Sequence, residues 1–89
     1  MMLIGPPDKR TLQKTFNRVL NEILDGTLSC APLGNGLDDQ TRAALNDLAL
    51  HRNTQRAVKI IAAYDELARQ LDGSHARQAQ ADVLKLLGP

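Results

Sequence analysis

The sequence predicts an all-α fold, a small single-domain bundle of about four helices. Apolar residues recur three and four positions apart in four separate stretches, which is the spacing of an amphipathic helical face. No stretch alternates apolar and polar residues as a half-buried strand does. The 89 residues, 43% of them hydrophobic, suffice for one core but not for two. We therefore expect one helical domain over 1–89, with a flexible N-terminal segment at 1–7.

The first helix is expected over 8–28. Its apolar residues follow the helical spacing, and Asp8 stands just after two prolines, where its carboxylate can cap the first turn. Gly26 is placed to end the helix. The stretch that follows combines Pro and Gly without a periodic pattern, so it is expected to be a long loop at 29–37.

Three further helices are expected over 38–50, 54–72 and 75–87. Asp38 begins an acidic pair where a helix N-terminus favours negative charge, and Ser74 is a candidate N-cap for the last helix. The helix over 54–72 carries the broadest apolar stripe, which predicts that it is the most buried of the four. The expected core draws on all four helices: Phe16, Leu20, Ile23, Leu45, Leu48, Val58, Ile61, Tyr64, Leu67 and Val83.

Composition argues against several classes of function. Eleven basic and ten acidic residues leave a net charge of +1, so overall charge does not indicate nucleic acid or an anionic membrane as the partner. His51 and His75 have no second ligand at metal-binding spacing, and no basic residue stands near Cys30. We therefore predict no metal, no cofactor and no catalytic residue, and we do not expect an enzyme.

Two features indicate the compartment. The apolar start at 1–4 is too short for a signal-peptide core or a membrane span. The single cysteine excludes an internal disulfide and fits a reducing compartment. A cytoplasmic protein with no membrane partner is expected.

Local charge is more informative than total charge. Arg52, Arg56 and Lys59 are four and three positions apart, so on a helix they form one ridge of like charge, whose repulsion an anionic partner would offset. A second ridge stands on the first helix: Arg10, Lys14 and Arg18. Each ridge can equally be solvated surface, because long basic side chains commonly cover apolar surface.

Residues 40–56 combine a short helix rich in small residues, a turn closed by an apolar residue, and the polar helix start His51-Arg52-Asn53-Thr54. This segment resembles the helix-turn-helix of Fis-like regulators and of PucR-type regulators of purine catabolism. In those families the second helix of the motif lies in the major groove. The resemblance implies a small transcriptional regulator that binds double-stranded DNA.

The resemblance also assigns roles to residues. Leu48 and Leu50 would pack the turn, and His51 would cap the second helix. Arg can read guanine, and Asn or Gln can read adenine, at the edge of the major groove. Lys59 stands where those families carry an apolar residue. The DNA-binding residues expected on this basis are Arg42, Arg52, Asn53, Gln55, Arg56 and Lys59.

A second class of function is a non-enzymatic helical interaction protein. Such a protein covers another one, as an inhibitor, an antitoxin or immunity partner, a secretion chaperone or a phage-encoded modulator does. Its contacts would come from the first helix and the long loop: Arg10, Lys14, Arg18, Leu33 and Leu37. For either class we expect a homodimer joined along the apolar edge of the first or last helix, because a chain of this length buries little surface and helix-turn-helix proteins commonly bind paired half-sites.

Overall fold

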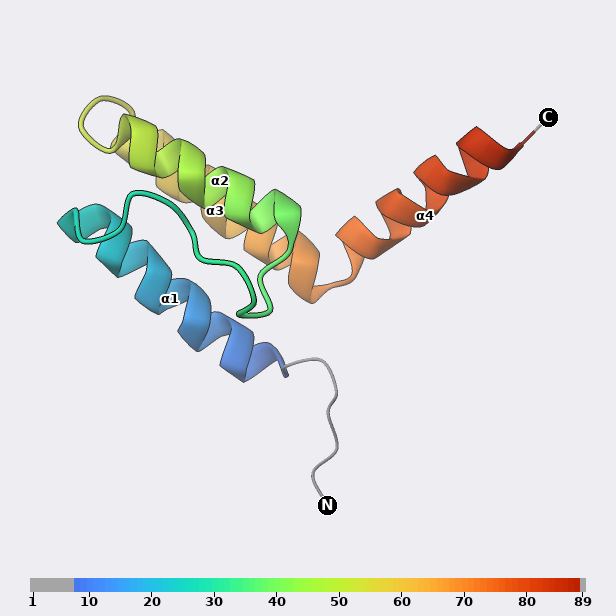
Figure 1. Cartoon of the computed structure of the whole chain (residues 1–89), viewed down its shortest axis with the longest axis horizontal. Coiled ribbons are helices and arrows are strands. Elements are labelled where there is room, and N and C mark those ends of the chain that lie inside the picture. The colour runs from blue at the N-terminus through green and yellow to red at the C-terminus, as the bar shows by residue number, and fades with distance from the viewer. Residues whose placement is uncertain (1–7, 89) are drawn as a thin grey trace, which may run out of the picture.

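The computed structural model describes residues 8–88, and all four of its regular elements are helices (Figure 1). They follow in order as α1 (Lys9–Asp25), α2 (Asp39–His51), α3 (Arg56–Leu71) and α4 (Ser74–Leu87). The predicted all-α class is therefore confirmed, and each expected helix overlaps the observed one over most of its length. The expectation for segment 1–7 lies outside the described residues.

Local sequence explains where the first two helices begin and where α1 ends. The Asp8 carboxylate accepts a hydrogen bond from the backbone N–H of Thr11 at 2.7 Å, and the Asp38 carboxylate accepts one from that of Thr41 at 2.9 Å. Gly26 ends α1 with a φ of 86°, in the left-handed region that glycine enters without steric cost. Because this glycine ends the helix, α1 stops at Asp25, three residues earlier than expected, and the loop that follows is longer than 29–37.

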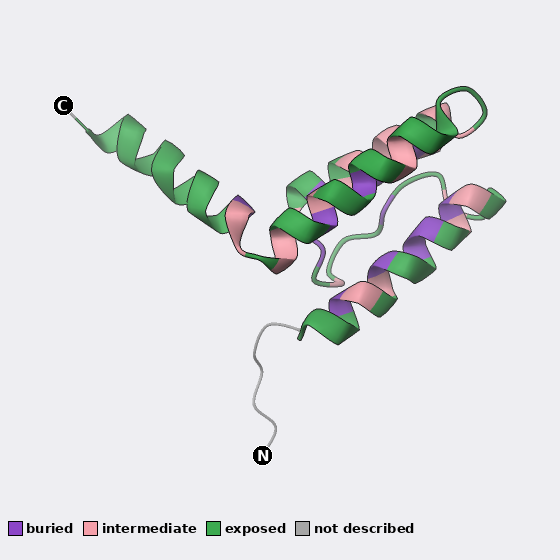
Figure 2. Cartoon of the chain, turned by 180° about the vertical axis from the view of Figure 1, so that it is seen from behind, coloured by how far each residue is buried: buried purple, intermediate pink, exposed green. Residues whose placement is uncertain are grey.

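The loop between α1 and α2 passes between these two helices and is fastened at two points (Figures 1 and 2). The backbone N–H of Ala31 donates to Asn46 Oδ1 at 2.6 Å, and the side chains of Ala31 and Leu37 are both buried. At its end, the Gln70 side chain of α3 donates through Nε2 to the Gly36 carbonyl at 2.7 Å. Gln70 Oε1 accepts from the Asp38 backbone N–H at 3.1 Å. The loop is thereby joined to both α2 and α3.

The core lies between α1 and the pair formed by α2 and α3, which run antiparallel and side by side (Figure 2). The Phe16 ring of α1 is fully buried, and its centroid lies 5.0 Å from that of Tyr64. Full burial of an aliphatic or aromatic side chain contributes about 1.5–3 kcal/mol, so apolar packing is sufficient to hold α1 in place. The buried apolar side chains are Leu12, Phe16, Val19, Leu20, Ile23, Ala31, Leu37, Leu45, Leu48, Ala63 and Leu67.

Six of the ten expected core residues are buried, Leu67 of α3 among them, but the other four are not. Val58, Ile61, Tyr64 and Val83 are exposed by 65%, 69%, 43% and 52%, and α1, not α3, buries the most side chains. The reason is that α3 is apolar on two sides. One side holds Ala63 and Leu67 in the core, and the other side, with Val58 and Ile61, faces solvent. Periodicity alone does not determine which side faces the core.

Candidate interaction surface

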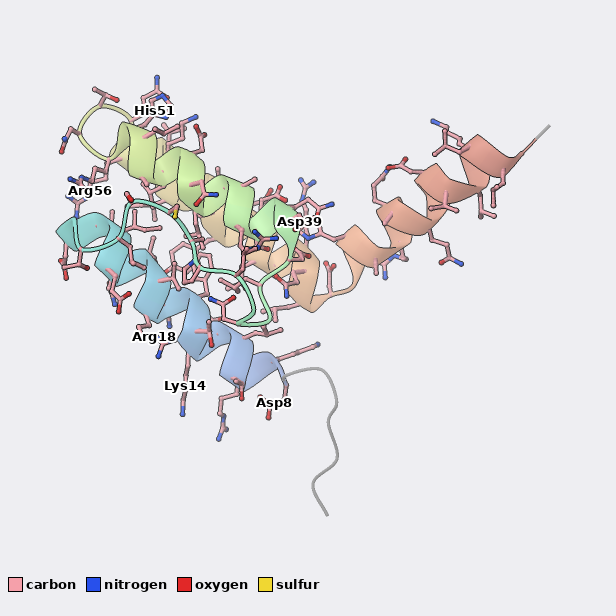
Figure 3. The ribbon with its side chains drawn as sticks, in the orientation of Figure 1. Asp8, Lys14, Arg18, Asp39, His51 and Arg56 are labelled. Atoms are coloured by element: carbon pink, nitrogen blue, oxygen red, sulfur yellow. The ribbon has the colours of Figure 1, made fainter. Side chains whose placement is uncertain are left out.

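The structure divides the six expected DNA-binding residues between the two ends of α2. Arg42 lies in its first turn and pairs with Asp39, whereas Arg56 lies beyond its last turn, and Figure 3 shows Asp39 and Arg56 at opposite ends of the helix pair. At 1.5 Å per residue, the nine steps from Arg42 to His51 alone span about 14 Å. Arg42 is therefore not brought together with the other five.

Two of the remaining cations are bonded within the fold. Arg52 Nη1 donates to the Ile23 carbonyl at 3.3 Å, which satisfies a carbonyl at the C-terminal end of α1. Lys59 Nζ lies 2.7 Å from Asp47 Oδ2, and its side chain is only 22% exposed. The hydrogen bond from Lys59 holds the pKa of Asp47 below its ordinary value. The ridge from Arg52 to Lys59 is therefore partly structural, because two of its three cations are bonded to other parts of the fold.

The turn between α2 and α3 carries the exposed remainder of the set. Asn53, Gln55 and Arg56 are all exposed there, and no side-chain hydrogen bond or ion pair joins them to another described residue. Of the two leucines expected to pack the turn, Leu48 is fully buried but Leu50 is 81% exposed. The expectation for Leu50 was therefore wrong.

His51 closes the last turn of α2 through its backbone rather than through its side chain. The His51 carbonyl accepts hydrogen bonds from the backbone N–H groups of Thr54 and Gln55, at 3.0 and 2.8 Å. The Nδ1 atom of its ring lies 3.0 Å from the Asp47 carbonyl, one turn earlier in the same helix. The N-cap of α3 is Gln55, which makes no side-chain capping hydrogen bond.

The basic ridge on α1 is open to solvent. Arg10, Lys14 and Arg18 are exposed, and no ion pair joins them to another described residue. In Figure 3 the labelled Lys14 and Arg18 point away from α2 and α3. Of the two leucines expected to join this ridge in binding a partner, Leu33 is 76% exposed, but Leu37 is 6% exposed and belongs to the core. The expectation that Leu37 contacts a partner was therefore wrong.

The largest departure from an ordinary monomer surface is apolar and lies on α3 and α4. Among the described residues, nine large hydrophobic side chains are exposed, and all except Leu33 and Leu50 lie on these two helices. We call them the α3 stripe and the α4 stripe. The α3 stripe is Val58, Ile61 and Tyr64, and the α4 stripe is Val83, Leu84, Leu86 and Leu87. Grouped apolar exposure of this kind marks interaction sites on soluble proteins.

The start of α4 is fixed by a buried histidine between two carboxylates. His75 Nδ1 lies 2.6 Å from Asp38 Oδ2 at the start of α2, and His75 Nε2 lies 2.8 Å from Glu66 Oε2 on α3. Partial burial disfavours the charged ring, but the hydrogen bonds and charges of the two carboxylates outweigh this effect and raise the pKa of His75. For Asp38, burial acts to raise the pKa, but the hydrogen bonds from Thr41 and His75 outweigh it, so the pKa of Asp38 lies below its ordinary value. When both of its nitrogens carry a proton, the ring can donate to both carboxylates and so connect α4 with α3 and with the start of α2.

Sequence reasoning missed this cluster. It treated Asp38 only as a cap and His75 only as a potential metal ligand, and their separation of 37 residues carries no local signal. Nor is Ser74 the N-cap of α4, as was expected. Gly73 occupies that position with a φ of 83°, while the Asp72 carboxylate accepts from the Ser74 backbone N–H at 2.8 Å. This arrangement directs α4 away from its own α3 (Figure 1).

Comparison of the chain with protein-family models, with curated proteins and with solved structures found no match. Within residues 8–88, no helix is long and apolar enough to cross a membrane. In the same part of the chain, no group of three or more His, Cys, Asp or Glu side chains is arranged to hold a metal ion. The function has to be argued from the surfaces described above.

Proposed function

We propose that the protein is a non-enzymatic helical interaction protein that binds another polypeptide through the α3 and α4 stripes. The observation that carries this proposal is the exposure of α4. Only His75, at its start, is buried, and Val83, Leu84, Leu86 and Leu87 all face solvent. A helix of 14 residues is marginal in water on its own, because most helical stability in proteins comes from packing an amphipathic face. A partner that covers the α4 stripe would supply that packing.

DNA binding is the competing proposal, and the exposed Asn53, Gln55 and Arg56 at the α2–α3 turn favour it. Apolar side chains, however, do not bind phosphate. Three of the four cations expected at a DNA interface are bonded within the fold. Exposed Val, Ile and Leu together with a near-neutral charge fit a protein partner better than a nucleic acid.

The basic ridge of α1 adds an electrostatic preference to this proposal. Three like charges on one side of a helix repel each other, and an acidic surface that approaches Arg10, Lys14 and Arg18 removes this repulsion. Complementary charge of this kind raises the rate of encounter and selects among partners more than it raises affinity. The ridge lies on a different helix from the α3 and α4 stripes, so an acidic group of a partner can meet it independently of the apolar contact.

The α4 stripe can be tested with a matched pair of variants. Leu84→Lys and Leu50→Lys make the same chemical change at exposed leucines in the last turns of α4 and α2, where a lysine suits the helix dipole. The tagged full chain is used to capture proteins from its own source. We expect Leu84→Lys to lose a stoichiometric partner that the wild type and Leu50→Lys both retain.

A salt titration distinguishes protein binding from DNA binding. Fluorescence anisotropy on random duplex is recorded at two salt concentrations, for wild type and Arg56→Ala. The protein-binding proposal predicts no salt-dependent change in the anisotropy of the duplex, for wild type or for Arg56→Ala. Two results together would favour the DNA-binding proposal over the protein-binding one. The anisotropy would rise with added protein, and this rise would weaken with salt and in Arg56→Ala. The set of captured proteins would be the same for wild type and Leu84→Lys.

A further inference from the structure

We infer that the polypeptide covering the apolar surface is a second copy of this chain, with α4 of each copy lying on the α3 stripe of the other. The inference rests on the proposed function, because it names the partner of the same surface. One chain carries both halves of the contact, three apolar side chains on α3 and four on α4. A reciprocal exchange therefore makes two identical contacts related by a twofold axis, which closes the assembly at two chains.

The start of α4 explains why a single chain leaves its own α3 stripe uncovered. His75 is held at 2.6 Å from Asp38 and 2.8 Å from Glu66, and the Asp72 carboxylate receives the Ser74 backbone N–H. These bonds fix the first turn of α4, and the helix then extends away from α1, α2 and α3 (Figures 1 and 2). A projecting helix with an apolar side is suited to reach another molecule.

The area available matches what a stable dimer needs. The seven side chains of the two stripes, at roughly 100 Å² each, offer about 700 Å² per chain. Two copies would then bury about 1,400 Å² in total, inside the range of about 1,200–2,000 Å² for specific protein interfaces. Neither stripe provides this area alone, so the contact requires both helices of both copies.

The charges beside the stripes do not oppose this contact. On α4 they are of both signs, Arg77, Asp82 and Lys85, and on α3 Asp65 already pairs with Arg69 at 3.1 Å. Two copies can therefore approach along these helices without bringing together a block of like charge.

The oligomeric state of the full chain tests the inference. Light scattering after size exclusion, across micromolar concentrations, should give twice the mass of 9.7 kDa for wild type and for Leu50→Lys. Ile61→Lys and Leu84→Lys should each give 9.7 kDa, because each variant damages both contacts of the dimer. Far-ultraviolet circular dichroism of the same samples should show that every variant keeps the helical content of a folded chain.

Mixing the two damaged variants tests the exchange itself. A pair made of one Ile61→Lys chain and one Leu84→Lys chain keeps one undamaged contact, the wild-type α4 of the first on the wild-type α3 stripe of the second. We therefore expect the mixture to recover dimer that neither variant forms alone. Such recovery also shows that both variants are folded.

Three results would overturn the inference. Wild type that stays at 9.7 kDa at every concentration excludes the second copy. A dimer that Leu50→Lys disrupts as strongly as Leu84→Lys does not use the α4 stripe. A mixture that recovers no dimer excludes the exchange of α4 onto α3. The proposed function is lost together with the inference only if Leu84→Lys also captures the same proteins as wild type.

Discussion

The contact of His75 with two carboxylates makes the stability of the chain depend on pH, and His75→Gln should remove the alkaline part of that dependence. Asp38 and Glu66 raise the pKa of His75 above its ordinary value of 6.5 despite partial burial. A group whose pKa is raised by folding stabilises the fold fully below its unfolded pKa, and this contribution is lost as the pH rises through the folded pKa. Asp38, with a lowered pKa, contributes above 3.8 and loses its contribution as the pH falls through its folded pKa.

The size of the effect follows from the hydrogen bonds involved. A hydrogen bond to a charged group is worth about 1.5–3 kcal/mol, and glutamine can replace only one of the two that His75 makes. The free energy of unfolding of His75→Gln should therefore be lower than that of wild type by about 1.5–3 kcal/mol at about pH 5.5. At alkaline pH, above the folded pKa of His75, wild type has itself lost the imidazolium, so the difference should fall below about 1 kcal/mol.

Urea denaturation followed by circular dichroism measures both differences, with His51→Gln as the control. The control keeps the three-helix cluster, so it should retain the pH dependence of wild type. In wild type, the Hε1 resonance that is missing from His75→Gln should titrate with a midpoint above 6.5. A wild-type stability that stays level from about pH 5.5 to a pH above the folded pKa of His75, or an equal loss in His75→Gln at both ends, would refute the reasoning.

The other predictions concern the bonds of Gln70 and the position of the core. Gln70→Leu removes its hydrogen bonds to the Gly36 carbonyl, the Asp38 backbone N–H and the Thr41 hydroxyl, so it should lower the free energy of unfolding by about 1.5–4 kcal/mol at every pH, measured by urea denaturation. Leu45→Ala, at a fully buried site, should lower the same quantity by about 2–5 kcal/mol. Leu50→Ala, on the same helix but 81% exposed, should change it by less than about 0.5 kcal/mol, and equal losses at the two leucines would contradict the core described here.

The starts of α1 and α2, and the glycine that ends α1, could be predicted because the signals that set them are local. Asp8 caps a backbone N–H three residues away, and Asp38 does the same for α2. Gly26 ends α1 through its own backbone conformation. Each of these effects acts within one turn of the chain, so it can be read from neighbouring residues.

On α1 and α2 every expected core residue is buried, whereas of the four expected on α3 only Leu67 is. On α1 a single stripe exists, and Phe16, Leu20 and Ile23 are buried as expected. On α3 there are two, and large Ile61 indicated the wrong one, while small Ala63 is fully buried in the core. Apolar periodicity gives most weight to large side chains such as Ile61, so it does not identify a small buried residue such as Ala63 as part of the core.

The polar cluster of His75, Asp38 and Glu66 could not be predicted from spacing. His75 lies on α4, Glu66 on α3 and Asp38 at the N-cap of α2, and only the folded chain brings them within hydrogen-bond distance. Gln70 reaches Gly36 across 34 positions in the same way. The candidate surfaces depend on which cations are exposed. Lys14 is solvated and Lys59 is bonded to Asp47, and the sequence alone does not distinguish the two.

The long loop is fastened at Ala31 and Gly36, and residues 32–34 between these two points are exposed to solvent. Ala31 and Leu37 are buried, whereas Leu33 and Gly34 are exposed, and a Cβ placed at Gly34 would meet nothing within 4 Å. Lengthening a loop whose ends are already held costs little entropy, about 0.6 kcal/mol for each doubling of its length. A peptide tag or a fluorescent reporter inserted after Gly34 should therefore leave the helices intact. The chain thus has a permissive internal site for labelling that is not part of either helix carrying an apolar stripe.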